Sequence, residues 1–178
     1  MKKIVNRDFK GLTFTNGRHT YDGDLYISGD TTIDIDFIDG DLVVGGNLTT
    51  NKDITVSGKI QVYGDFVANG NVVCSTVAVE ANATVNGNFE AEQFCISGDL
   101  TVSGDTKAKR GISQVNGSLT TTNLVIDRLY VGGSRNIKGK MYYCHRLAWF
   151  YMMGSFPDRH IDHINGISND HRIENLRL

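Results

Sequence analysis

Short alternations of apolar and polar residues fill the chain between residues 20 and 125. Segments 25–27 (Leu-Tyr-Ile), 54–56 (Ile-Thr-Val) and 77–79 (Val-Ala-Val) place apolar side chains at every second position. Alternation with a period of two is typical of β-strands that bury one face. Because strands this short are not stable alone, the pattern predicts many strands that pack against one another.

A glycine, a polar residue and an apolar residue recur between these strands, as in Gly23-Asp24-Leu25 and Gly64-Asp65-Phe66. Neighbouring glycines lie six residues apart, at 23/29, 40/46 and 58/64/70, and steps of 17 or 18 residues link 23 to 40 and 40 to 58. Three steps of about six residues make one turn, called a coil below. We therefore predict a mostly β fold, with a three-sided parallel β-solenoid of roughly six coils and about 17–18 residues per turn.

Stacking explains why such a sequence would fold. Coils spaced by ~4.8 Å pair their backbones and bury the inward side chains in one continuous core. Glycine with Asp or Asn suits the corners, where we expect φ > 0 to be required and side-chain bulk to be penalised. An antiparallel sandwich is the alternative, but it predicts strands every 8–12 residues rather than every six.

The G-D-L-x-V-x-G-D pattern, seen at residues 98–105, resembles the repeats of bactofilin-type polymer-forming β-helix proteins. The resemblance implies self-association, because the open end of a solenoid is an unpaired strand edge. We expect a homo-oligomer formed through the ends or faces of the solenoid, with residues 1–19 as an N-terminal cap.

From about Leu124 the repeat dissolves. Residues 128–131 and 140–144 predict a hairpin, and residues 145–152 predict a helix that Gly154 and Pro157 end. We expect the aromatic run 149–151 (Trp-Phe-Tyr) to lie in a hydrophobic core. The expected domains are thus a cap over 1–19, a solenoid over 20–125 and a small α+β domain over 126–178.

Three spaced motifs, H-R-L-A-W-F-Y at 145–151, I-D-H-I-N-G at 161–166 and R-I-E-N-L-R-L at 172–178, are similar to the HNH endonucleases common in phages and mobile elements. The resemblance implies a ββα-metal fold that holds one divalent ion over a DNA phosphodiester. It makes His163 the general base, Asp162 a metal ligand and Asn175 the residue that aligns the base. Oxygen ligands favour Mg²⁺ or Mn²⁺, and Asn165-Gly166 predicts a turn.

Charge supports DNA as the partner. Residues 1–133 hold 11 Lys and Arg against 16 Asp and Glu, whereas residues 134–178 hold seven against four. A basic end on an acidic body suits phosphate contacts. The candidates for these contacts are His145, Arg146, Arg159 and Arg172.

The HNH resemblance also implies a last helix, which carries a second metal ligand about nine residues beyond the position of Asn175. Residue 178 comes before it, so we expect an incomplete nuclease site. Three hypotheses stay open: a DNA-nicking enzyme on a solenoid, a non-catalytic structural or ligand-binding solenoid with a relic HNH tail, and a site that a partner chain completes.

Composition excludes other classes. Of the 178 residues 40% are apolar, yet no tract of about 20 apolar residues occurs, so we expect no membrane-spanning segment. Three cysteines without a C-x-x-C pair indicate neither a disulfide framework nor a cysteine zinc site. We expect a cytoplasmic protein, because the charged start of the chain lacks the apolar stretch of a signal peptide.

Overall fold

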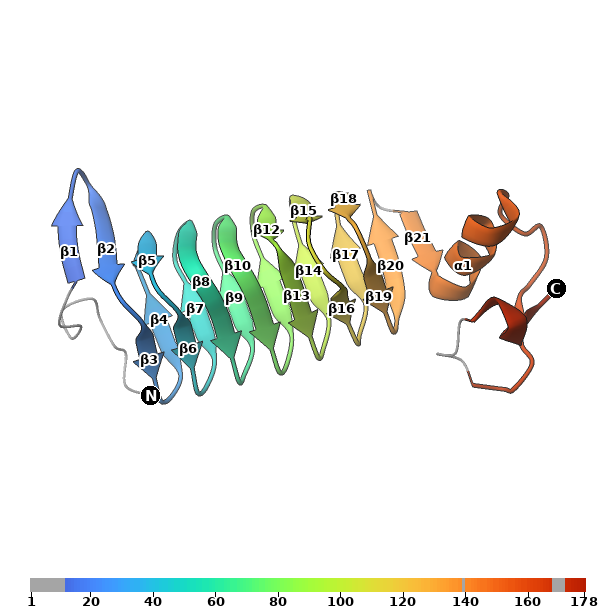
Figure 1. The fold of residues 1–178 in the computed structure, drawn as a ribbon, viewed down its shortest axis with the longest axis horizontal. Coiled ribbons are helices and arrows are strands. Elements are labelled where there is room, and N and C mark those ends of the chain that lie inside the picture. Colours follow the sequence, from blue (N-terminus) through green and yellow to red (C-terminus); the bar gives the residue numbers. More distant parts are fainter. Residues whose placement is uncertain (1–11, 139, 168–171) are drawn as a thin grey trace.

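The structure, a computed structural model, describes residues 12–138, 140–167 and 172–178. Figure 1 shows a rod of stacked coils, followed at one end by a helix and a short C-terminal segment. Strands make up 53% of the chain and helices 6%, and the rod has about seven coils. The predicted parallel β-solenoid is therefore confirmed, with one coil more than expected.

Each coil contributes one strand to each of three parallel ladders, which form the three faces of the rod. The first face consists of β2 (Arg18–Asp22), β5 (Phe37–Asp39), the first half of β8 (Ile54–Val62), the first half of β10 (Val72–Val79), β12 (Phe89–Ala91), β15 (Asp105–Ala108) and β18 (Asn123–Ile126). The second face consists of β3 (Leu25–Ile27), β6 (Leu42–Val44), the second halves of β8 and β10, β13 (Gln93–Ile96), β16 (Ser113–Val115) and β19 (Leu129–Val131). The third face consists of β4 (Thr31–Ile33), β7 (Leu48–Thr50), β9 (Phe66–Ala68), β11 (Ala83–Val85), β14 (Leu100–Val102), β17 (Leu119–Thr121) and β20 (Ser134–Ile137).

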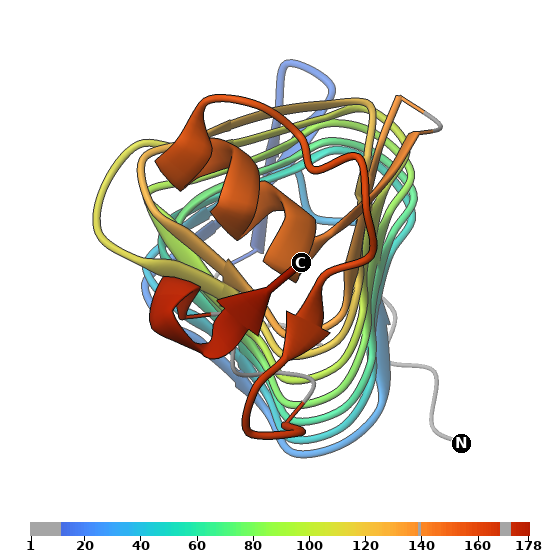
Figure 2. The ribbon, with the colours of Figure 1, turned by 90° about the vertical axis from the view of Figure 1, so that its right-hand side faces the viewer.

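The register of the ladders reproduces the spacing of the sequence repeat. Leu25 pairs with Leu42, and Leu42 pairs with Ile60, which are the expected steps of 17 and 18 residues. One coil is longer, because Leu100 pairs with Leu119. The extra residues form the loop 109–112, which stands out from the rod in the end-on view of Figure 2.

A single apolar core fills the rod from its first coil to its last. Inward side chains of successive coils lie directly above one another, as Leu48 and Phe66 do in neighbouring strands of the third face. Both side chains are almost completely buried. Removing this apolar surface from water is the main term that stabilises the stack.

The corners are held by a ladder of side-chain amides and carboxylates. At the corner before the third face, Asn47 Oδ1 accepts the N–H of Asp65 (2.7 Å), and Asp65 Oδ1 accepts the N–H of Asn82 (3.0 Å). A Cβ on Gly64 would collide with Asn47 Oδ1. The expectation that φ > 0 explains the glycines is wrong at Gly64, which is outside the left-handed region, and correct at Gly23, where φ is 96°. Close approach to the coil below is what excludes a side chain at Gly64.

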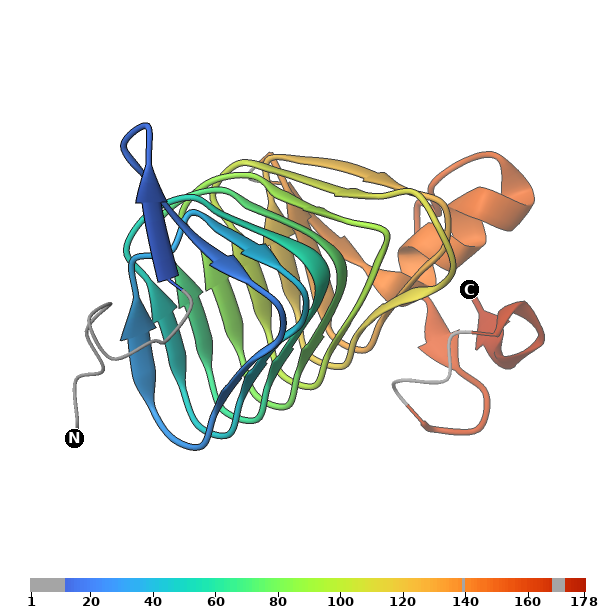
Figure 3. The same cartoon turned by 60° about the vertical axis from the view of Figure 1, so that its left-hand side comes forward.

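Antiparallel strands occur at both ends of the rod. At the N-terminal end, β1 (Leu12–Thr15) pairs with β2, and Figure 3 shows this hairpin at the end of the rod that faces the viewer. At the other end, β21 (Lys140–Tyr143) pairs with β20. The hairpin predicted between residues 128–131 and 140–144 is therefore wrong in its first strand, because residues 129–131 form β19 in a parallel ladder of the rod. Parallel pairing thus continues to Ile137, past residue 125, where we expected the solenoid to end.

The helix α1 (Cys144–Met153) and the segment that follows it lie over the C-terminal end of the rod (Figures 1 and 2). Beyond α1 the described elements are β22 (Asp162–His163), the 3₁₀ helix η2 (Ile173–Asn175) and β23 (Leu176–Arg177). None of the helices among the described residues is long and apolar enough to cross a bilayer.

Candidate functional site

Two short strands of the C-terminal segment bring three predicted site residues together. β22 and β23 pair antiparallel, with Asp162 opposite Arg177 and His163 opposite Leu176. Asn175 directly precedes β23, and its carbonyl accepts the N–H of Ile164 at 2.8 Å. The pairing therefore places Asp162, His163 and Asn175 in one small unit.

A tight turn follows His163. The N–H of Gly166 donates to the carbonyl of His163 at 2.9 Å, and Gly166 has a φ of 70°, a conformation that suits glycine. The turn predicted from Asn165-Gly166 is confirmed. Its returning strand is β23, which begins ten residues after Gly166 rather than directly behind the turn.

Asn175 holds this turn in place. Its side chain is buried, its Oδ1 accepts the N–H of Asn165 at 2.9 Å, and its Nδ2 donates to Asn165 Oδ1 at 2.9 Å. Asn165 Oδ1 also accepts the N–H of Ile167. A buried amide with reciprocal bonds fixes the backbone just beyond His163. The role of Asn175 in aligning a general base stays a prediction.

Asp162 is paired with a residue that the sequence analysis did not single out. Arg177 Nη2 lies 2.8 Å from Asp162 Oδ2, and Asp162 Oδ1 accepts the N–H of His163 at 2.8 Å. The hydrogen bond from Arg177, followed by the bond from the His163 N–H, lowers the pKa of Asp162 below its ordinary value. Asp162 is consequently an anion at neutral pH, with both carboxylate oxygens engaged. Arg177 belongs to the third motif, but only the strand register reveals its partner.

His145 lies beside His163. The two rings meet edge to face, with centroids 5.3 Å apart and planes at 84°. His145 is in the first turn of α1, whereas His163 comes from β22. The motifs named both histidines, but 17 intervening residues hide their proximity in the sequence. Helix and strand together thus bring two imidazoles next to each other in the unit that contains Asp162.

The donor set around Asp162 does not fit a hard cation such as Mg²⁺ or Mn²⁺, which prefers six or more oxygen ligands. It offers one carboxylate, which an arginine engages, and two imidazoles. Within residues 12–138, 140–167 and 172–178, no three His, Cys, Asp or Glu side chains gather as metal ligands do. We therefore derive no catalytic step through a metal, and the identity of the ion stays a prediction.

The four predicted phosphate contacts differ in their surroundings. Arg146 donates to the carbonyls of Arg159 (3.0 Å) and Pro157 (2.5 Å), so it fastens the segment after α1 to the helix. Arg159 has an exposed side chain. Arg172 is also exposed and lies 3.7 Å from Glu174, a loose ion pair. His145 contacts His163, as described above. Arg159 and Arg172 are thus the exposed cations of this group.

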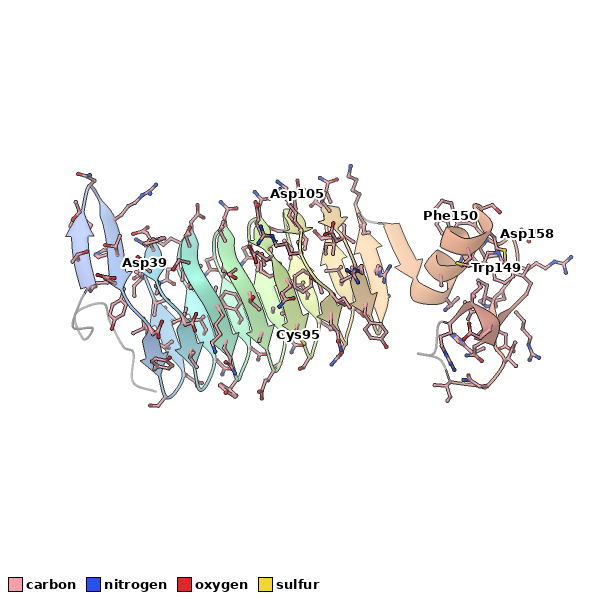
Figure 4. All side chains as sticks on the ribbon, viewed as in Figure 1. Asp39, Cys95, Asp105, Trp149, Phe150 and Asp158 are labelled. Atoms are coloured by element: carbon pink, nitrogen blue, oxygen red, sulfur yellow. The ribbon has the colours of Figure 1, made fainter. Side chains whose placement is uncertain are left out.

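Two aromatic side chains of α1, Trp149 and Phe150, are less buried than expected, and the side chain of Tyr151 lies outside those that the structure describes. Figure 4 labels Trp149 and Phe150 on the helix. Phe150 is 42% exposed and stacks on Phe156, with ring centroids 4.5 Å apart. The expectation of a core position is wrong for Phe150, because the described segment packs over only part of this short helix. Trp149 is half-buried.

Comparison with protein families divides the chain at residue 142. The bactofilin model, described as polymer-forming cytoskeletal, matches residues 36–142, and the model described as HNH endonuclease matches residues 142–178. No curated protein and no solved structure gives a match. The two matches confirm both resemblances, and they coincide with the rod and with the segment that contains Asp162 and His163.

Proposed function

The chain belongs to the bactofilin family of polymer-forming proteins, and from this premise we propose that it is a self-assembling β-solenoid scaffold with a DNA-contacting HNH-like segment at one end. The scaffold accounts for most of the chain, whereas the HNH match is confined to residues 142–178. The observation that carries the proposal is the uniform parallel ladder, whose first coil presents strand edges at the end of the rod opposite α1, where a strand of another copy can pair.

The first coil offers strand edges for this continuation. Among the described residues, β3 pairs only with β6 and β4 pairs only with β7. The N–H of Thr31 donates to Asn47 in the second coil, and consecutive N–H groups of a strand point in opposite directions, so the N–H of Thr32 points away from the rod. Such an edge is a template for a strand of another molecule.

A proline at this edge tests the assembly. Thr32→Pro removes an outward N–H but, among the described residues, no bond within the rod, and proline is tolerated in edge strands. We expect wild-type protein to form larger species as its concentration rises, in sedimentation velocity and negative-stain electron microscopy. Thr32→Pro should keep its circular dichroism spectrum but lose these species, and Thr32→Val, which keeps the N–H, should retain them. Equal assembly of Thr32→Pro and wild type would contradict the proposed edge.

DNA contact by the C-terminal segment rests on its basic charge and on its HNH match. Arg159 and Arg172 have exposed guanidinium groups, which suit contacts with phosphate oxygens. Assembly of the rods would display many copies of this segment, and the combined avidity would exceed the affinity of one copy.

Fluorescence anisotropy with duplex DNA over a range of salt concentrations tests this contact. The Arg159→Gln and Arg172→Gln variants should each weaken binding and reduce the salt slope by about one phosphate contact. Arg110→Gln, on the rod, is the matched control, because Arg110 already pairs with Glu92 at 3.2 Å. Equal affinities for all three variants and wild type would exclude a contact through these arginines.

DNA cleavage is the second candidate function, favoured by the HNH match and by the gathering of Asp162, His163 and Asn175 in one unit. Because the donors around Asp162 do not by themselves fit Mg²⁺ or Mn²⁺, it requires further ligands, as from a partner chain. A supercoiled-plasmid nicking assay with Mg²⁺ and with Mn²⁺ should compare wild type with His163→Ala. Nicking by wild type alone would establish the enzyme. If both preparations nick alike, the candidate fails and the segment is a binding module.

A further inference from the structure

The outward side of the second face carries a column of uncharged side chains along the whole rod. One residue from each coil contributes, in strict register from coil to coil. The column consists of Tyr26, Val43, Gln61, Ala78, Cys95, Gln114 and Tyr130. Tyr26 is 67% exposed and Tyr130 44% exposed, and Figure 4 shows Cys95 about midway along the rod. The column thus has a small side chain, Ala78, at its centre and a tyrosine at each end.

The corner beside this column changes its charge along the rod. Its first two coils carry four carboxylates, from Asp22, Asp24, Asp39 and Asp41. Figure 4 labels Asp39 toward the N-terminal end. The coils near the other end carry three cations against one carboxylate, from Lys109, Arg110, Arg128 and Asp127. Among the described residues, two exposed pairs offset part of this polarity: Asp41 lies 3.9 Å from Lys59, and Arg110 lies 3.2 Å from Glu92 of the coil before it.

From the uncharged column and the polar corner together, we propose that the second face binds the second face of another copy, with the two rods antiparallel. The two-fold axis lies between the faces, along the strand direction at Ala78. Ala78 then meets the partner's Ala78, and Tyr26 meets the partner's Tyr130. A two-fold interface of this kind is self-complementary and closed.

Charge selects the antiparallel orientation. In it, Asp24 lies opposite the partner's Arg128, and the acidic first coils of one rod lie against the basic loop 109–112 of the other. A parallel arrangement, with the two-fold axis along the rod, would place Asp24 opposite the other corner of the partner's first coil, which carries Asp30, and the two carboxylates would repel. Glu80, at the other edge of the face, meets the partner's Glu80 and opposes the pairing.

The size of the strip predicts a weak dimer. Seven strands at ~4.8 Å give a length of roughly 30 Å, so the buried area falls below the ~800 Å² per partner of a standard interface. Such a contact gains strength from avidity when many copies share a filament. Because it uses a face and not an end, it goes beyond the proposed end-to-end assembly and does not depend on it.

Cross-linking at the centre of the face tests the contact directly. Ala78→Cys is made in a Cys95→Ser, Cys144→Ser background, in which Cys74 stays buried, and is treated with a short bismaleimide. Facing sheets lie ~10 Å apart, so a covalent dimer is expected. Thr84→Cys in the same background is the control, because Thr84 occupies the outward position of the third face one strand later.

The outcome separates this inference from end-to-end assembly, which leaves the residues at position 78 of different copies apart. Dimer from Ala78→Cys and none from Thr84→Cys supports the face. No dimer at position 78, or equal dimer at positions 78 and 84, overturns it, even where larger species persist in sedimentation.

A charge exchange tests the orientation. Asp24→Arg and Arg128→Asp should each lower the yield of the position-78 dimer by about two- to fivefold, and the double variant should restore it. Glu80→Gln should raise the yield. A double variant that is as impaired as the two single variants combined would overturn the antiparallel pairing.

Discussion

The rod and the C-terminal segment are stabilised in different ways. In the rod, apolar side chains such as Leu48 and Phe66 form one core that runs through every coil. In the described part of the segment after α1, the buried side chains are only Pro157, Ile161, Asn175 and Leu176. There, specific hydrogen bonds such as those between Asn165 and Asn175 hold the backbone.

This difference determines how far a perturbation spreads. Each coil of a solenoid is stabilised by its neighbours, so damage inside the rod reaches adjacent coils. The segment is joined to the rod through β21 and α1 and has its own small set of contacts. Damage there should stay local. The segment is therefore free to vary in chemistry while the rod keeps its shape.

Truncating an aromatic side chain in the core of the rod should lower the free energy of unfolding more than any other change proposed here. Phe89 is 1% exposed and its ring lies 5.2 Å from that of Phe94. Phe89→Ala should lower the free energy of unfolding by about 3–5 kcal/mol, measured by chemical denaturation. Phe150→Ala in the segment, where the ring is exposed, should change it by less than about 0.5 kcal/mol. Comparable losses in the two variants would remove the contrast between the regions.

The second-largest loss of stability is expected when a methyl group is added to a glycine at a corner of the rod. Gly64→Ala forces Cβ against Asn47 Oδ1 and should cost about 1–3 kcal/mol through overpacking. Gly29, at the equivalent corner of the first coil, has nothing within 4 Å of an added Cβ, so Gly29→Ala should be close to neutral. The same denaturation measurement applies. If Gly29→Ala is as harmful as Gly64→Ala, close approach is not the reason for glycine at the corners.

Removing Asn175 should loosen the segment but not the rod. Asn175→Ala removes a buried amide and leaves the part-buried N–H of Asn165 without its acceptor, at a cost of about 0.5–1.5 kcal/mol for each lost hydrogen bond. Hydrogen exchange of residues 162–167 should accelerate, with an unchanged denaturation midpoint for the rod. Asn86→Ala, which loses only an exposed bond to Asn69, is the control. Unchanged exchange in Asn175→Ala would show that the turn is held by other contacts, and a lowered midpoint for the rod would show that the damage does not stay local.

The smallest change in stability is expected from breaking the exposed ion pair between Asp162 and Arg177. Because Arg177 lowers the pKa of Asp162, the pair stabilises the segment above the ordinary carboxylate pKa, and this contribution is lost as pH falls through the lowered value. Arg177→Gln should raise the pKa of Asp162 toward its ordinary value, as followed by NMR titration of the carboxyl. Arg172→Gln should leave it unchanged. An unaltered titration in Arg177→Gln would assign the shift to the His163 N–H alone.

The solenoid could be predicted because its signals are local and repeated. Alternation within a strand identifies the inward side chains, and glycines six residues apart mark the corners, so one repeat predicts the next. The site could be predicted only as a set of residues. The motifs identified His163 and Asn175, but not that His145 lies against His163 or that Arg177 engages Asp162. These contacts join residues on separate elements, connected by segments without a repeat.

By itself, the sequence determined the three-sided parallel stack, its 17- to 18-residue coil and the resemblance of its two parts to two families. The tertiary structure decided why Gly64 is glycine, which side chains engage Asp162, and that an uncharged column shares the rod with a corner of opposite charges at its two ends. The physical reason is the separation in sequence of the residues that interact. Periodicity can be read from neighbouring positions of the chain, whereas close approach and charge pairing depend on which coils and strands lie side by side.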